Sequence, residues 1–331
     1  VLAAAKQALE VDGLGSAASR LITGSMDAHL EAEATLAAFV RAEASLFFST
    51  GYAANVGAIQ ALADPSTLVL SDALNHASLI DGIRLSRARA HVYRHADLEH
   101  AESLLREHRA DASRALIVTD AVFSMDGDIA PLRELRALAD RYDAWLFVDE
   151  AHSLGVFGPG GRGLCAREGI TADVLVGMLG KSFGLAGAFV AGERALRELL
   201  VHRARSYVFS TAPSPILARA ATAAVGVILE SDALREQLLA HASRLRTALP
   251  ALGFEVPPGQ GPIVPVILGE ADRTMRASAA LLEAGFLAQG IRPPTVPRGT
   301  SRIRLVPMGT HEHSDIDALI DAFATLAAQG L

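Results

Sequence analysis

Short apolar runs rich in Val, Ile, Leu and Phe recur along the N-terminal part of the chain and predict β-strands. Most are apolar at consecutive rather than alternate positions, as expected for strands covered on both faces of a sheet. The predicted strands are 44–50, 66–72, 90–95, 114–120, 144–150, 173–178 and 187–192.

Longer segments with helical spacing separate these strands and predict helices over 53–63, 98–109 and 131–142. Pro131 opens the last of them, where its missing N–H is harmless. Alternating strands and helices indicate an α/β fold with a mainly parallel seven-stranded sheet and helices on both sides. Such sheets bind ligands beyond the C-terminal ends of their strands.

The pattern changes after a long helical stretch at 213–249. Further strands are predicted at 263–269, 291–296 and 301–307, with helices at 274–285 and 314–328. This part indicates a smaller C-terminal α+β domain. We therefore expect a large domain over 1–233 and a small domain over 234–331.

Composition narrows the function classes. The 331-residue chain is 50% hydrophobic, and its net charge of −7 argues against a general nucleic-acid binder. A single cysteine, Cys165, excludes a disulfide framework and favours a reducing compartment, the cytoplasm. No apolar run reaches the ~18 residues of a membrane span. The chain opens without Met inside a helical pattern, so we expect a further segment before Val1.

Residues with useful chemistry follow the predicted strand ends. They are Gly51, His76, Asp120, Asp149, His152 and Lys181. By contrast, His311 and His313 in "THEHSD" lack metal-ligand spacing and are interpreted as residues at a helix start. The G-x-S-x-G elbow of a Ser-His-Asp hydrolase is absent.

Lys181 is unusual because only two of the 30 Lys and Arg residues are Lys. An Arg cannot lose its proton and act as a nucleophile, whereas a Lys amine can. Lys181 in "MLGKSFG" could therefore hold a phosphate or form an imine. A phosphate loop requires Gly five residues before the Gly-Lys pair, and position 175 is Leu. The spacing favours the imine.

Pyridoxal phosphate (PLP) requires a Lys, an acid opposite its ring nitrogen and donors for its phosphate. Lys181 and Asp149 could supply the first two, and the turn "STGYAAN" (49–55) could hold the phosphate with its N–H groups. His76 could lie on the ring and His152 could contact its phenolic oxygen. Taken alone, Asp149 could equally be a helix N-cap, and each His a structural residue.

Several ordered motifs together resemble the α-oxoamine synthases, a fold-type I family of PLP-dependent transferases. They run from about Gly13 to the C-terminus: "TGSMDAHLEAEATLA", "FFSTGYAAN", "SDALNHASLIDGIRLS", "VFSMDGDIAPL", "VDEAHSLGVFGPGGRG", "GKSFGLAGAFVAG", "YVFSTAPSP" and "IRPPTVPRGTSRIRL".

The resemblance implies roles for matching residues around PLP. Lys181 would form the Schiff base and move the substrate α-proton, Asp149 would keep the ring nitrogen protonated, and His76 would stack on the ring. The remaining cofactor contacts would come from Gly51, Tyr52, Ser124 and His152, and from Ser210 and Thr211 reaching the second subunit of a homodimer with shared sites. His76, Thr295 and Arg304 would contact the substrate, with Arg304 holding its carboxylate.

The implied reaction is a decarboxylative condensation of an amino acid with an acyl thioester. "IRPPTVP" and Thr295 resemble the branch that joins L-alanine to a pimeloyl thioester, carried by CoA or acyl carrier protein, on the route to biotin. The branch that joins glycine to acetyl-CoA is the alternative. A non-enzyme alternative is an inactive, regulatory relative. Retention of Lys181, Asp149, His76 and His152 together argues against it.

Two departures from the family bear on the site. The family places Thr three residues before the Schiff-base Lys, where its hydroxyl meets the phosphate, and here Met178 offers no donor. We therefore expect weaker PLP binding. The family's N-terminal segment with a substrate-contacting Arg also has no counterpart before Val1.

Overall fold

The computed structural model describes residues 1–331, and the chain divides into two compact units. Unit 1 comprises Val1–Ala121 and Ala130–Ser231, and unit 2 comprises Val122–Ile129 and Asp232–Leu331. The short segment Val122–Ile129 interrupts unit 1 in sequence yet belongs to unit 2. The hydrophobic pattern of the chain does not indicate that this segment belongs to unit 2.

Unit 1 is built on a seven-stranded sheet in the order β1-β7-β6-β5-β4-β2-β3. β7 is antiparallel to both of its neighbours, and the other adjacent strands pair in parallel. The mainly parallel α/β sheet predicted from the sequence is therefore confirmed. The strands are β1 (Ala44–Phe48), β2 (Thr67–Asp72), β3 (Arg89–Tyr93), β4 (Arg114–Asp120), β5 (Ala144–Asp149), β6 (Val174–Met178) and β7 (Ala188–Gly192).

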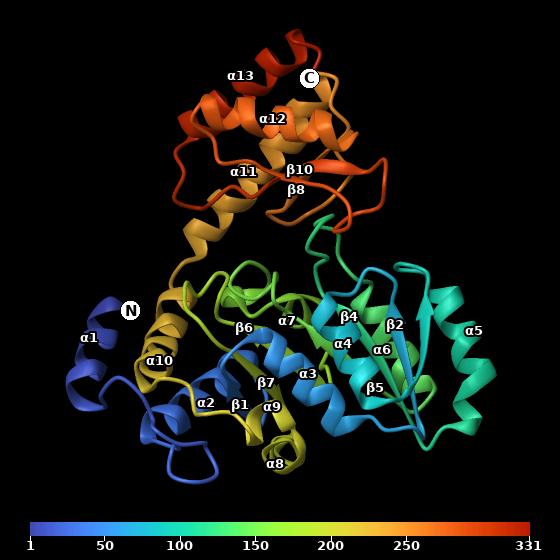
Figure 1. The fold of residues 1–331 in the computed structure, drawn as a ribbon, viewed down its shortest axis with the longest axis vertical. Coiled ribbons are helices and arrows are strands. Elements are labelled where there is room, and N and C mark those ends of the chain that lie inside the picture. Colours follow the sequence, from blue (N-terminus) through green and yellow to red (C-terminus); the bar gives the residue numbers. More distant parts are fainter. The chain divides into compact units, whose positions relative to one another are not determined.

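Helices of unit 1 connect these strands (Figure 1). They are α1 (Leu2–Val11), α2 (Asp27–Val40), α3 (Gly51–Leu62), α4 (Ala77–Ser86), α5 (Leu98–His108), α6 (Leu132–Arg141), α7 (Leu164–Glu168), α8 (Arg194–Arg203), α9 (Arg205–Val208) and α10 (Pro215–Leu229). α3 begins where the side chain of Thr50 accepts the N–H of Ala53 at 3.1 Å, a regular N-cap.

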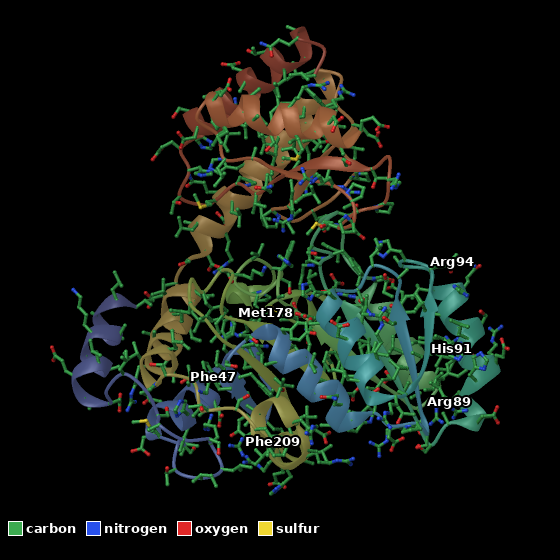
Figure 2. The ribbon with its side chains drawn as sticks, in the orientation of Figure 1. Phe47, Arg89, His91, Arg94, Met178 and Phe209 are labelled. Carbon is green, nitrogen blue, oxygen red and sulfur yellow. The ribbon has the colours of Figure 1, made fainter.

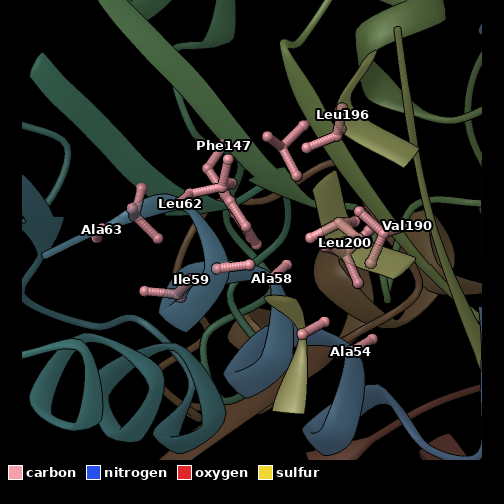
Figure 3. Close-up of a cluster of buried hydrophobic side chains, with 14 of the residues drawn as sticks. Ala54, Ala58, Ile59, Leu62, Ala63, Phe147, Val190, Leu196 and Leu200 are labelled. Carbon is pink, nitrogen blue, oxygen red and sulfur yellow. The ribbon is translucent and has the colours of Figure 1, made fainter. Parts of the chain in front are cut away.

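Both faces of this sheet are buried. On one face Leu46 and Phe48 of β1 join a cluster formed with α3, α8 and α9, and Figure 3 shows part of it. Phe47, which lies between them in sequence, is also fully buried but is not in this cluster. Because successive side chains of a strand point to opposite faces, Phe47 packs on the other side. Consecutive apolar positions in these strands reflect this double cover.

Unit 2 contains a small antiparallel sheet in the order β8-β10-β9. Its elements are α11 (Asp232–Ala251), β8 (Val264–Gly269), α12 (Ala271–Glu283), β9 (Gln289–Ile291), β10 (Ser301–Leu305) and α13 (His313–Ala328). The strand predicted at 291–296 is wrong, because β9 ends at Ile291. Pro293 and Pro294 lack the N–H groups that a ladder needs.

The predicted helical stretch 213–249 is two helices, since α10 ends at Leu229 and α11 begins at Asp232. The division between the units falls in this break. No helix of the chain combines the length and the apolar character that crossing a membrane requires.

Candidate active site

Asp149 ends β5 and is buried, with 1% of its surface exposed. Its Oδ2 accepts a hydrogen bond from Asn55 Nδ2 at 2.7 Å, and its Oδ1 accepts the N–H of Ala151 at 2.9 Å. Burial raises the pKa of Asp149, while these two hydrogen bonds and the charges of His76 and Lys181 oppose the rise. A buried carboxylate with this surrounding is suited to a cationic partner.

Asp120 ends β4 and lies opposite Asp149 in the register of the sheet. It is also buried, and its Oδ2 accepts the backbone N–H of His76 at 2.7 Å. Burial and then the charge of Asp149 raise the pKa of Asp120 well above its ordinary value. Asp149 has more donors and nearby cations than Asp120, so the pair takes up its first proton on Asp120.

His76 caps the start of α4 with its ring exposed. Its Nδ1 accepts the backbone N–H of Ser78 at 3.2 Å and lies 2.7 Å from the Ser78 hydroxyl oxygen. In the neutral form of the ring, these contacts place the hydrogen on Nε2. These contacts fix the position and tautomer of the imidazole at the edge of the sheet.

The N-terminus of α3 presents Gly51 and Tyr52, the first residues of the helix. Their N–H groups have no acceptor inside the helix and are suited to an anion. Met178, labelled in Figure 2, ends β6. Its side chain lies over this turn. A Cβ at Gly51 would collide with Sδ and Cε of Met178, with Cγ 2.9 Å away.

Lys181 follows β6 in an exposed turn. The Gly-rich turn places its side chain at the surface, so the amine is not desolvated by this chain's own residues. The turn is held by bonds from the N–H of Gly184 to the Lys181 carbonyl and from the N–H of Leu185 to the carbonyl of Leu179. His152 is half-buried, three residues after Asp149.

Ser210 and Thr211 lie elsewhere in unit 1, after α9. They line a small cavity together with Arg20 and Ser49. Thr211 is exposed, and it forms an isolated β-bridge with Ser19.

Ser124, Thr295 and Arg304 belong to unit 2. Nε of Arg304 donates to the carbonyl of Ser124 at 2.6 Å. Arg302, two residues earlier on β10 and buried, forms an ion pair with Asp126. Burial lowers the pKa of Arg304, so its guanidinium favours a carboxylate partner. Thr295 is exposed in the turn after β9.

These observations test whether unit 1 fits PLP. At the ring end the residues fit, since buried Asp149 offers a carboxylate to a protonated nitrogen and His76 presents an oriented ring. At the phosphate end the free N–H groups of α3 fit an anion, but Met178 covers part of that seat and adds no donor. No group of three or more His, Cys, Asp or Glu side chains is arranged to hold a metal ion.

The sequence motifs do not indicate a role for Asn55 or Ser78. For Asp120 they indicate only its position at the end of a strand. Asn55 Nδ2 donates to Ser78 Oγ at 2.9 Å as well as to Asp149. A possible signal was the position of Asn55, one helical turn after Gly51 and hence on the same face of α3.

Comparison with known proteins gives consistent results. The profile of the family "Aminotransferase class I and II" matches residues 1–323. The 8-amino-7-oxononanoate synthase of Anaeromyxobacter dehalogenans is 48% identical over 98% of this chain and 82% of that protein. The protein of the same name from Geobacter sulfurreducens is 48% identical over 98% of this chain and 84% of its own length.

Solved structures agree. A serine palmitoyltransferase of Sphingomonas wittichii superposes with a TM-score of 0.95 at 32% identity, over 99% of this chain and 83% of that one. An 8-amino-7-oxononanoate synthase of Francisella tularensis gives 0.85 at 27% identity, over 99% and 93%.

Proposed function

Because this chain belongs to the aminotransferase class I and II family and, within it, to the α-oxoamine synthases, we propose that it catalyses the 8-amino-7-oxononanoate synthase reaction. This is the PLP-dependent condensation of L-alanine with a pimeloyl thioester, with loss of carbon dioxide, in biotin biosynthesis. The sequence relatives at 48% identity support this branch.

One structural observation carries the proposal: the carboxylate of Asp149 is buried at the end of a strand and has no directly bonded cation. PLP, when bound, supplies an electron sink that makes the Cα–H bond of an amino acid acidic. Asp149 would accept the N–H of the pyridine ring and hold that proton in place. The donors from Asn55 and Ala151 keep this carboxylate charged.

The remaining residues of unit 1 have separable tasks in this proposal. Lys181 is exposed, and its amine would take the proton from Cα, since a Lys amine can act as a base where Arg cannot. His76 would cover one face of the cofactor ring. His152 would donate to its phenolic oxygen, and the N–H groups of Gly51 and Tyr52 would bind its phosphate.

In unit 2, Arg304 would bind the carboxylate of the amino acid. Its Nε is already engaged by the Ser124 carbonyl. This bond fixes the plane of the guanidinium and leaves its Nη groups for a two-point contact. We further propose that Ser124 contacts the cofactor and that Thr295, in its exposed turn, contacts the acyl substrate.

We propose that the working form is a cytoplasmic homodimer with shared sites, in which Ser210 and Thr211 reach the partner's cofactor. Support comes from large apolar side chains exposed on unit 1, which no element of the unit covers. They are Leu2 (78% exposed), Val11 (74%), Leu14 (75%), Ile22 (76%) and Phe209 (71%). Phe209, labelled in Figure 2, directly precedes Ser210.

The first test is the absorbance of the purified protein with PLP during separate titrations with L-alanine, glycine and L-serine. A Schiff-base band that responds to alanine at the lowest concentration supports the proposal, and release of carbon dioxide with a pimeloyl thioester completes it. A preference for glycine would assign the chain to the acetyl-CoA branch.

Met178 is the observation that favours an inactive relative. Absence of a Schiff-base band at every PLP concentration would support that alternative and overturn the proposed reaction.

A further inference from the structure

Asn55, on α3, connects the carboxylate of Asp149 to the ring of His76. One hydrogen of its Nδ2 points to Asp149 Oδ2 at 2.7 Å, and the other to Ser78 Oγ at 2.9 Å. Ser78 Oγ in turn lies 2.7 Å from His76 Nδ1. An amide group has two hydrogens, so both donors of Asn55 are engaged.

The orientation of this amide is determined by its neighbours. Turning it over would place Oδ1 against the oxygen of Asp149, where two acceptors repel each other. In the observed orientation, Oδ1 of Asn55 has no hydrogen-bond partner although the residue is fully buried. A buried carbonyl without a donor costs stability. The unpaired Oδ1 therefore lowers stability, while both hydrogens of Nδ2 remain bonded.

The hydrogen bonds form a directed chain. His76 Nδ1 already accepts the backbone N–H of Ser78, so it is an acceptor. The Ser78 hydroxyl accepts from Asn55 and therefore donates its own hydrogen to Nδ1. Asn55 thus acts on His76 through Ser78, and on Asp149 directly.

We propose that Asn55 is a positioning residue for the cofactor, which keeps Asp149 charged at the ring nitrogen and, through Ser78, orients the His76 ring. The inference rests on the proposed PLP-dependent function. It adds to that function a residue that links the two groups on which the cofactor ring would rest.

The electrostatic surroundings support this role. Burial raises the pKa of Asp149, and the hydrogen bond from Asn55 is the largest effect in the opposite direction. Asp149 also faces Asp120 on β4, the charges of His76 and Lys181, and the adjacent Glu150. Without Asn55, Asp149 would hold a proton at higher pH and lose its attraction for a protonated ring nitrogen.

The experiment compares Asn55→Leu, which has nearly the shape of Asn without its donors, with Ser78→Ala, which removes only the connection to His76. The carboxyl carbon of Asp149 is titrated by NMR in apo-protein labelled at Asp, with Asp149→Asn giving the assignment. PLP affinity is then measured across the same pH range by absorbance. Asn55→Ala replaces Asn55→Leu if circular dichroism shows that the Leu variant is unfolded.

We expect Asn55→Leu to move the Asp149 titration to higher pH and to weaken PLP binding at neutral pH by roughly ten- to a hundredfold. Ser78→Ala should leave the Asp149 titration in place. An unchanged Asp149 titration in the Asn55 variants would overturn the inference, whatever PLP does. Failure of the wild-type protein to bind PLP would instead overturn the proposed function, while the NMR titration would still decide the role of Asn55.

Discussion

Replacing Met178 by Thr is expected to tighten PLP binding. The Met178 side chain lies over Gly51, at the first turn of α3, where the N–H groups would receive the phosphate. Thr is shorter and would clear this seat, and its hydroxyl would add a donor to an anion. A hydrogen bond to a charged group contributes about 1.5–3 kcal/mol, which corresponds to roughly ten- to a hundredfold in affinity.

The same substitution has a separate effect on stability. Met178 is half-buried and packs against the cluster that joins α3 to the sheet. Loss of its thioether is expected to lower the free energy of unfolding of the apo-protein by about 1 kcal/mol, since part of the side chain is already exposed. Cofactor affinity must therefore be compared between two variants that both lack the Met178 side chain and its contribution to stability.

Met178→Val supplies the control, because Val matches Thr in shape and lacks the hydroxyl. Apo forms of the wild type and both variants are titrated with PLP, and the Schiff-base absorbance gives Kd. We expect Thr to bind tighter than Val by the factor above, with Val reporting the effect of clearing the seat alone. Equal affinities of the Thr and Val variants would refute the argument that a hydroxyl at position 178 reaches the phosphate.

Three further predictions concern other parts of unit 1. Lys181→Ala should abolish turnover while PLP still binds. Borohydride reduction followed by mass spectrometry should show PLP attached to Lys181 in the wild type and no attachment in the variant. Turnover by the variant would contradict the mechanism. Asp120 has a raised pKa in the folded state, so its contribution to stability is present at low pH and is lost as pH rises through that pKa. Asp120→Asn should therefore melt at a higher temperature than the wild-type apo-protein at alkaline pH, and the difference should shrink as pH falls through the raised pKa of Asp120. A difference in melting temperature that does not change with pH would contradict this prediction. Phe209→Glu should convert the proposed dimer to monomers in light scattering, whereas Glu107→Lys, on the exposed surface of α5, should not.

The location of the candidate site was predictable because parallel strands end at one edge of a sheet. Asp149 and His76 follow different strands and are far apart in sequence, yet the order of hydrophobic runs was enough to place both at that edge. Lys181 was placed on the same grounds. Its exposure was not predictable, since a Gly-rich turn can bury or present a side chain with the same sequence.

Contacts that depend on tertiary packing were not predictable. Asn55 and Asp149 are 94 residues apart, so the spacing of Asn55 along α3 indicates which face of the helix it occupies but not which residue it bonds. The membership of Val122–Ile129 in unit 2 also depends on contacts between residues far apart in the sequence. It depends on Arg302 and Arg304, two residues apart on β10, whose side chains bind the distant loop.

α3 determines how the two ends of the proposed cofactor site are spaced. Gly51 and Asn55 are one turn apart on this helix, about 6 Å along its axis, so one rigid element carries both the phosphate seat and the donor to Asp149. Along the same face of α3, Ala58 and Leu62 anchor the rest of the helix in the core (Figure 3). Met178 lies over the Gly51 end of this helix, whereas Asn55 keeps its hydrogen bond to Asp149. Met178→Thr should therefore change the affinity for the cofactor and leave the protonation of the cofactor's ring nitrogen unaltered.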